Sequence, residues 1–481
     1  MHAVADLFRR LTSLGLWGGT CAVFSLWVAS GNVAFGAAIL AGLLLFLAIL
    51  SGPQLIVALW LMGSPTVFSL ANQLLAALPF ITMERVMFVV LSGMIAMKAI
   101  FGISGRYPRI GLEMLIVVFL CYTLISLAAS TSSIGLRRDL WFYLQYAMPM
   151  FMFILSRRIE WTERGVKFLL AGLTVTGAIL AVVGILQELF GITIFTIDFQ
   201  NVTAGHVARA HGTFSNAHTY SATLVVFLSL TIMQFGIYRD ALVRFVLLLT
   251  MFIMVVGILL GQTRAPWGGA ALALFIILLR DRSVRPLLVT GGVLALIACG
   301  VVTYLMIDQL GSFVERVTDL RTMAGRMATW ATALNMIAHN PMFGVGFGVD
   351  SFALHKPEYL TGVGSLTQQY AVYLGVPHNE YLHVAVLLGL PGLILFLCIV
   401  VGMIRLMFRI HMDTENSSVR RRLAVYVGAT IIGLLFNSTF SDTYLQDYFW
   451  MLTYFLAGLA TGMPRDFWRL EGPETLGRET S

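Results

Sequence analysis

The stretch RFVLLLTMFIMVVGILLG, residues 244–261, decides the class of this protein. Its only charged residue is Arg244, at its start, and about 17–25 consecutive apolar residues suffice for a helix to cross a bilayer. Comparable stretches recur from residue 14 to residue 463. They predict membrane spans at residues 14–30, 33–50, 54–76, 85–103, 112–129, 139–155, 167–190, 219–237, 244–261, 266–280, 287–307, 381–404, 423–439 and 445–463.

The composition of the whole chain agrees with this interpretation. Hydrophobic residues make up 58% of it and charged residues 11%, against about 45–50% and about 25% in soluble domains. We therefore expect an all-α integral membrane protein with about 12–14 transmembrane helices. The simplest arrangement is one polytopic membrane domain over residues 1–481.

The distribution of basic residues predicts how the spans are oriented. With both ends in the cytoplasm, including the tail at residues 464–481, only nine of the 31 Lys and Arg residues face the other side. This is the excess of basic residues expected in cytoplasmic loops. The same excess accounts for the net charge of +7, so the charge gives no reason to expect a nucleic-acid partner.

Two external connections, residues 191–218 and 308–380, are unusually long, and the second is the longer. Loops of more than about 12–15 residues are usually functional or disordered, and neither of these has a disordered composition. Within residues 308–380, GRMATWATALNMIAHNP (325–341) predicts a short amphipathic helix on the outer leaflet. Its apolar face would consist of Met327, Trp330, Ala331, Leu334, Ile337 and Ala338. The glycines of the following MFGVGFGVDSF (342–352) favour a tight turn over a phosphate-binding loop, which needs a preceding strand.

Two external arginines stand at predicted span entrances. Arg264 lies in GILLGQTRAPWGGAALAL (257–274), and Arg209 lies in HVARAHGTFSNAH (206–218). One interpretation of Arg264 is a side chain that snorkels at a helix end. The other is oxyanion binding, because a guanidinium is permanently charged and forks its donors onto phosphate oxygens. Under the second interpretation, Arg209 and Arg264 could together bind one pyrophosphate.

A run of polar residues opens the span after the long loop, in GVPHNEYLHVAVLLGLPGL (375–393). His378 lies at the external mouth of that span, with Asn379 and Glu380 beside it and His383 further along. Taken alone, His378 is more often a hydrogen-bonded structural residue. Beside two candidate oxyanion ligands, its imidazole could accept a proton from a sugar hydroxyl at neutral pH.

Other polar residues on the external side are less specific. His206, His211 and His218 lack the spacing of helical metal ligands, so we expect them to bind backbone or sugar. Asp442 and Asp447 come to the same face and could pair with an arginine or position the acceptor.

Three of these segments together carry a resemblance. TRAPW (263–267), GRMATWATALNMIAHNPMFGVGFG (325–348) and PHNEYLHVAVLLGLPGL (377–393) resemble the bacterial O-antigen ligase and polymerase superfamily, the Wzy and WaaL group. The resemblance is specific over roughly residues 200–400 and topological elsewhere. It implies a multispanning glycosyltransferase of the bacterial inner membrane, with a bundle related to the C-type glycosyltransferases.

The resemblance also implies a reaction and roles for residues. A glycan would leave undecaprenyl diphosphate on the periplasmic side, with Arg209 and Arg264 as diphosphate ligands and His378 as base or acceptor-positioning group. Arg326 is a further candidate for donor contact, and Asn379, Tyr381 and His383 are candidate substrate contacts beside His378. A single displacement predicts inversion at the anomeric carbon. No Asp-x-Asp pair occurs in the chain, so we expect no metal and no cofactor.

The acceptor stays open at this point. Lipid A core would make the enzyme a ligase, a lipid-linked repeat unit would make it a polymerase, and a protein side chain would make it an oligosaccharyltransferase. Chain length and the number of predicted spans lean towards a polymerase, for which a chain-length regulator is a candidate partner. The alternative class is a transporter or flippase of lipid-linked oligosaccharides, but the chain lacks the matching broken helices of an internal repeat.

Overall fold

A computed structural model describes residues 52–66, 82–101, 110–130, 135–192, 209–305, 320–360, 375–445 and 447–468. All regular elements in these segments are helices, and five of them, α6, α8, α9, α10 and α17, are long and apolar enough to cross a membrane. The prediction of an all-α integral membrane protein is thereby confirmed. The number of spans and their orientation stay predictions.

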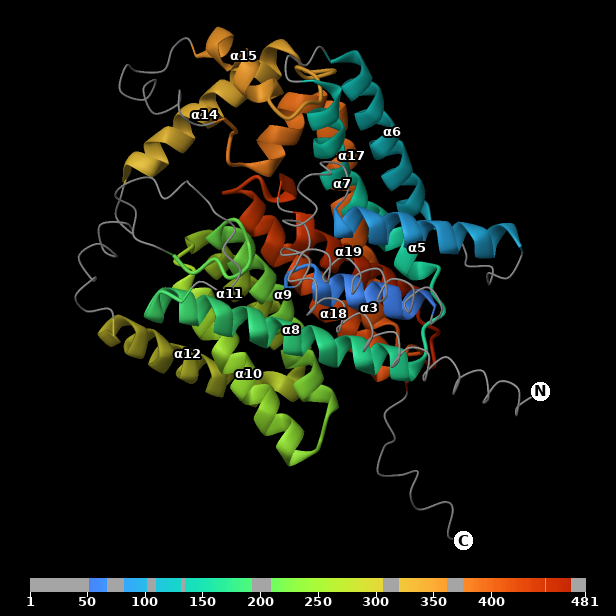
Figure 1. The fold of residues 1–481 in the computed structure, drawn as a ribbon, viewed down its shortest axis with the longest axis vertical. Helices are drawn as coiled ribbons and strands as arrows, with labels where there is room; N and C mark the ends of the chain where they lie inside the picture. Colours follow the sequence, from blue (N-terminus) through green and yellow to red (C-terminus); the bar gives the residue numbers. More distant parts are fainter. Residues whose placement is uncertain are drawn as a thin grey trace, which may run out of the picture. The chain divides into compact units, whose positions relative to one another are not determined.

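The chain divides into two compact units, residues 1–103 and 104–481. The single domain predicted from the sequence is not tested by this division. The first unit contains α3 (Pro53–Gly63) and α5 (Met83–Ile100). The second contains α6 (Gly111–Ala129), α7 (Leu136–Arg157), α8 (Glu163–Phe190), α9 (Ala217–Ile237), α10 (Ala241–Leu260), α11 (Arg264–Arg280), η1 (Arg282–Val284), α12 (Arg285–Leu305), α14 (Leu320–His339), α15 (Ser351–Tyr359), α17 (Glu380–Met412), α18 (Ser418–Ser438), η3 (Thr443–Leu445) and α19 (Asp447–Gly462). Figure 1 labels the α-helices.

Most predicted spans coincide with helices to within a few residues, because long apolar runs fix both the type and the extent of these elements. The span predicted at 54–76 is a partial exception, since α3 ends at Gly63. Gly63 is a poor helix former, and Pro65 has no N–H to donate to a continuing helix. The predicted spans 14–30 and 33–50 lie outside the described residues.

Small residues let the helices of the second unit approach closely, as is common in membrane bundles. Gly269 of α11 and Gly433 of α18 face each other, and a Cβ added to either glycine would meet the other's carbonyl oxygen. Gly458 of α19 lies equally close to Phe153 of α7. These contacts join α11 to α18 and α7 to α19.

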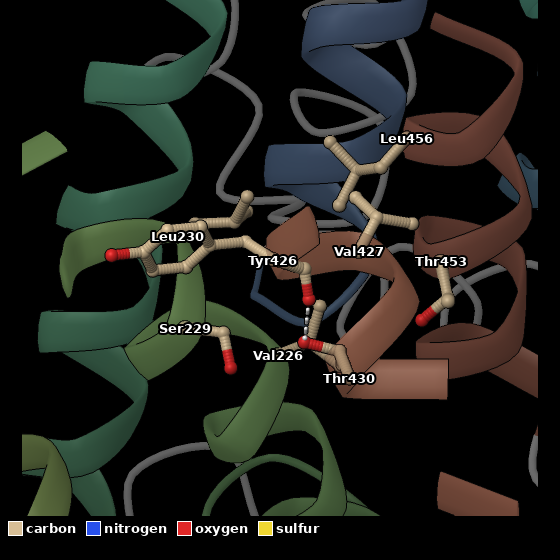
Figure 2. A pocket seen from close by; sticks show the side chains of 8 residues that line it. All are labelled: Val226, Ser229, Leu230, Tyr426, Val427, Thr430, Thr453 and Leu456. Carbon is tan, nitrogen blue, oxygen red and sulfur yellow. Dashed lines mark hydrogen bonds between the residues drawn. The ribbon is translucent and has the colours of Figure 1, made fainter. Parts of the chain in front are cut away.

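Helix α9 is the most enclosed of the five long apolar helices. Between α9, α18 and α19 lies a cavity of about 10 Å³, lined by Ser229, Thr430, Thr453 and five other residues (Figure 2). Such a volume holds about one water molecule. The Thr430 hydroxyl donates back to the Tyr426 carbonyl at 2.8 Å, as the dashed line in Figure 2 shows. The centre of the unit is therefore densely packed.

Helix α17 is interrupted at Gly389, whose φ of 69° is non-helical. The break frees backbone groups, which the turn after α14 satisfies. The N–H of Leu390 donates to the Pro341 carbonyl at 2.7 Å, and the N–H of Val345 donates to the Val386 carbonyl at 2.8 Å. A positive φ at Gly344 as well confirms that a tight turn explains the glycines of this segment. The turn fixes the first part of α17, which carries the candidate site.

The predicted helix in the long loop is present as α14, which packs with α15 beside α17 (Figure 1). The apolar face predicted to lie on the outer leaflet is not the face that packs against the protein. Met327 and Leu334 are 60% and 56% exposed, whereas Ala333 and Met336 are buried in a cluster with Val386 of α17. The face that packs against the protein therefore lies on another side of α14. Contact of Met327 and Leu334 with lipid stays a prediction.

Candidate active site

His378 is held in an unusual backbone conformation just before α17. Its φ of 54° lies in the left-handed region, which costs energy in a non-glycine residue and often marks a functional site. Two contacts fix it. The His378 N–H donates to Asp442 Oδ2 at 2.9 Å, and the preceding Pro377 carbonyl accepts the Trp330 indole N–H at 2.9 Å. The long loop thus positions His378 through α14.

Asp442 connects two histidines. It lies between α18 and η3, is 3% exposed, and places Oδ1 3.3 Å from His383 Nδ1 and Oδ2 3.6 Å from His378 Nδ1. Burial alone would raise the pKa of the Asp442 carboxyl, but His383 and His378 outweigh burial and hold that pKa below its usual value. A buried carboxylate needs such partners. Asp442 is therefore an anion that lies close to both rings.

The environment keeps the His378 imidazole neutral. Burial lowers the pKa of His378, Arg326 and His383 lower it further, and Asp442 opposes them without reversing the direction. A neutral ring with Nδ1 turned towards a carboxylate carries its proton there and leaves the lone pair of Nε2 available. The His378 side chain is 33% exposed. His378 can therefore act as a general base towards a molecule that approaches from outside.

A cluster of positive charge lies next to this pair. Arg326 projects from α14, and both its burial and the charge of Arg264 lower its pKa, so the two guanidinium groups are close enough to repel each other. Arg264 is exposed at the first turn of α11, where free N–H groups also favour an anion. An oxyanion bound between Arg264 and Arg326 would neutralise their positive charge.

Arg209 lies on a segment that approaches the start of α11, where Arg264 lies. It is exposed, and the N–H of the next residue, Ala210, donates to the Leu260 carbonyl at 3.4 Å, at the end of α10 and just before Arg264. The backbone pairing brings the Arg209 segment beside the entrance of α11. Whether Arg209 and Arg264 hold one diphosphate remains a prediction.

His218 belongs to this group, although its position before a predicted span indicated only a loop histidine bound to backbone or sugar. It lies in α9, with Nε2 3.0 Å from Asn437 Nδ2, and it interacts electrostatically with Arg326, His378 and Asp442. His211 instead binds the Phe214 carbonyl through Nδ1 at 2.8 Å, as expected of a loop histidine. His206 lies outside the described residues.

Glu380 anchors the start of α17. Its fully buried carboxylate accepts the Tyr146 hydroxyl at 2.7 Å and the Tyr444 N–H at 3.1 Å. The two tyrosine rings stack with their centroids 5.1 Å apart. These contacts tie α7, α17 and η3 together directly beneath His378. Glu380 is therefore a structural support for the site.

The other predicted substrate contacts have partners within the protein. Asn379 accepts the Leu382 N–H at 3.1 Å and caps α17, and the Tyr381 hydroxyl donates to the Leu435 carbonyl at 2.8 Å. His383 is buried against Asp442. This arrangement favours roles for Asn379 and His383 in positioning the site. Their contact with a substrate stays a prediction.

Asp442 is the residue whose role sequence reasoning did not resolve. The sequence predicts that Asp442 pairs with an arginine or positions the acceptor. Its ion-pair partners are His378 and His383, it also interacts electrostatically with Arg326, and acceptor positioning stays a prediction. In the part of the chain that the structure describes, no three His, Cys, Asp or Glu side chains are grouped as a metal-binding site.

Comparison with known proteins gives one family match, which covers part of the chain. Residues 249–397 match the family model described as O-Antigen ligase. The match contains Arg264, Arg326 and His378, whereas Arg209 and Asp442 lie outside it. No curated protein matches the chain. Residues 249–397 of this chain are therefore similar to the O-antigen ligase family, which supports the resemblance to the O-antigen ligase and polymerase superfamily of membrane glycosyltransferases.

Proposed function

We propose that this protein transfers a glycan from undecaprenyl diphosphate to a sugar hydroxyl at the periplasmic face of the bacterial inner membrane. The observation that carries the proposal is the group formed by His378, Asp442 and Arg326. It combines a neutral base, a carboxylate that stabilises its protonated form, and a cation for the leaving group. The family match supports the reaction class.

The proposed reaction is a single displacement. The acceptor oxygen attacks the anomeric carbon of the lipid-linked sugar, and its proton passes to Nε2 of His378. The bond between the anomeric carbon and the diphosphate oxygen breaks, and undecaprenyl diphosphate leaves with the electron pair. Attack from the face opposite the leaving group inverts the configuration. The energy comes from the donor linkage, so the reaction needs no ATP.

The charged residues have distinct parts in this scheme. Arg264 and Arg326, with Arg209 beside them, stabilise the charge that grows on the departing diphosphate. Donors fixed in place before the reaction usually provide the largest single contribution to catalysis. Asp442 holds His378 with Nδ1 towards the protein and stabilises the imidazolium that forms, as the aspartate of a catalytic triad does.

The acceptor defines the biological activity. A second lipid-linked repeat unit makes the enzyme a polysaccharide polymerase, which the chain length and number of predicted spans favour, and lipid A core makes it an O-antigen ligase. A polymerase would work with a chain-length regulator in the same membrane. The site geometry is the same in both cases, because donor activation does not depend on the acceptor.

The test uses the purified protein in nanodiscs, with an undecaprenyl diphosphate-linked repeat unit as sole substrate and a chelator present. A ladder of longer lipid-linked glycans is the expected product. Transfer that appears only after lipid A core is added would identify a ligase. His378→Ala should abolish both products, whereas His339→Ala, an exposed histidine on α14, should leave them unchanged. Movement of intact donor across the bilayer without any transfer would contradict the proposal and indicate a transporter.

A further inference from the structure

An apolar groove opens on the side of the second unit, between α9, α10, α11 and α12. Its volume is about 320 Å³, and every lining residue is apolar or glycine, including Ile232, Met251, Phe275, Leu278, Leu288 and Gly291. Helices α10 and α11 both pack on α9 but make little contact with each other, which leaves the groove between them. Phe275 is 55% exposed at its edge. The volume lies within the range of about 300–1,000 Å³ found for ligand sites.

The groove lies in the half of the bundle away from the candidate active site. Its lining on α11 runs from Ala271 to Leu278, which corresponds to about 10 and 21 Å along the helix from Arg264. On α12 the lining residues come from the first two turns, Leu287 to Gly292. The groove therefore reaches the basic end of these helices, which the charge bias assigns to the cytoplasm.

Positive charge surrounds this end of the groove. Arg280, Arg282 and Arg285 are all exposed within the short turn between α11 and α12. Arg285 donates through Nε to the carbonyl of Leu278, a lining residue, at 3.0 Å. The one carboxylate in the turn, Asp281, is buried and faces Arg422 instead. An apolar groove with an uncompensated basic mouth matches a lipid that has an anionic headgroup.

We propose that this groove binds one acyl chain of an anionic phospholipid of the cytoplasmic leaflet, with the lipid phosphate beside Arg282 and Arg285. Basic pockets between helices on the cytoplasmic side are typical sites for acidic lipids. The chain occupies the gap between α10 and α11 and stabilises α12 against the bundle. This binding is independent of glycan transfer, so either proposal can fail without the other.

The test measures lipid retention by native mass spectrometry of the full-length protein in detergent. Phosphatidylglycerol and phosphatidylcholine with identical chains are the two probes, and we expect at least tenfold tighter binding of phosphatidylglycerol. Arg282→Gln should weaken it about fivefold, and the double variant with Arg285→Gln about 25-fold, since each arginine near an anionic headgroup contributes comparably. Arg405→Gln, an exposed arginine on α17, is the matched control.

A second variant tests the groove itself. Gly291→Leu adds a side chain at a lining position where nothing lies within 4 Å of a new Cβ, so it should fill the groove without disturbing the fold. We expect this variant to weaken the binding of both lipids about tenfold. Gly300→Leu, on the same helix and also without neighbours within 4 Å, should change neither. Equal binding of the two lipids, or identical behaviour of the two glycine variants, would overturn the proposal. Displacement of phosphatidylglycerol by undecaprenyl phosphate would also overturn it, because the groove would then hold a polyprenyl tail.

Discussion

Substitution of Asp442 by Asn separates charge from shape at the proposed base. The asparagine oxygen can still accept the His378 N–H, which Asp442 now accepts at 2.9 Å. The backbone conformation of His378 should therefore survive. What disappears is the negative charge that stabilises the imidazolium after proton transfer. We expect glycan transfer to slow while the protein stays folded.

The geometry gives the size of the effect. His378 Nδ1 and Asp442 Oδ2 are 3.6 Å apart, and at an effective dielectric constant of about 20 two unit charges at that distance attract by about 5 kcal/mol. The His378 side chain is 33% exposed, so solvent screening reduces the attraction to about 2–3 kcal/mol. The corresponding decrease in rate is about 30- to 150-fold.

The assay is single-turnover transfer from a fluorescent lipid-linked donor in nanodiscs, at saturating donor and acceptor. Asp413→Asn, at the far end of α17, serves as the matched control and should react like the wild type. Because Asp442 raises the pKa of His378, its loss should also move the midpoint of the acid limb to lower pH. A rate within twofold of the wild type, with unchanged thermal stability, would refute the coupling of these two residues.

Three further predictions follow from the same geometry. Arg264→Lys and Arg326→Gln should each lower kcat/KM for the donor at least tenfold with little change in KM for the acceptor. A lysine cannot offer the two parallel donors of a guanidinium, and a glutamine carries no charge. Equal effects on both substrates would argue against diphosphate binding. Wild-type activity should rise with pH through a midpoint below about 6.5 and then stay level, because burial lowers the pKa of His378 and the ring must be neutral to accept a proton; a midpoint above that value would show that another group is titrating. Gly389→Ala should lower stability by about 1–3 kcal/mol in thermal unfolding, because a Cβ there would lie 2.6 Å from backbone atoms of Met342; unchanged stability would show that the turn can move aside.

The helices could be predicted from the sequence because they depend on local apolar runs. The same holds for α14, whose periodicity identified a helix between Gly325 and Pro341. Its orientation could not be derived in the same way. The predicted face included Met327 and Leu334, yet the packed face contains Ala333 and Met336, because the partner, α17, determines which side is buried.

At the candidate site, too, some residues could be identified from the sequence, whereas contacts between distant elements could not. His378, Arg264 and Arg326 stood out because charged and titratable residues are rare on the external side of a membrane protein. The role of Asp442 could not be derived, since its partners His378 and His383 precede it by a full helical hairpin and meet it only after α17, α18 and α19 have packed. Pairing between distant elements leaves no periodic signal in one sequence.

The most direct test of the central claim is the fate of the donor in a single-turnover reaction with chelator and acceptor present. The account predicts that wild-type protein releases undecaprenyl diphosphate in step with formation of a new, inverted glycosidic bond, and that His378→Ala does neither. Equal transfer by His378→Ala, or a product with retained configuration, would contradict the proposed base and the single displacement.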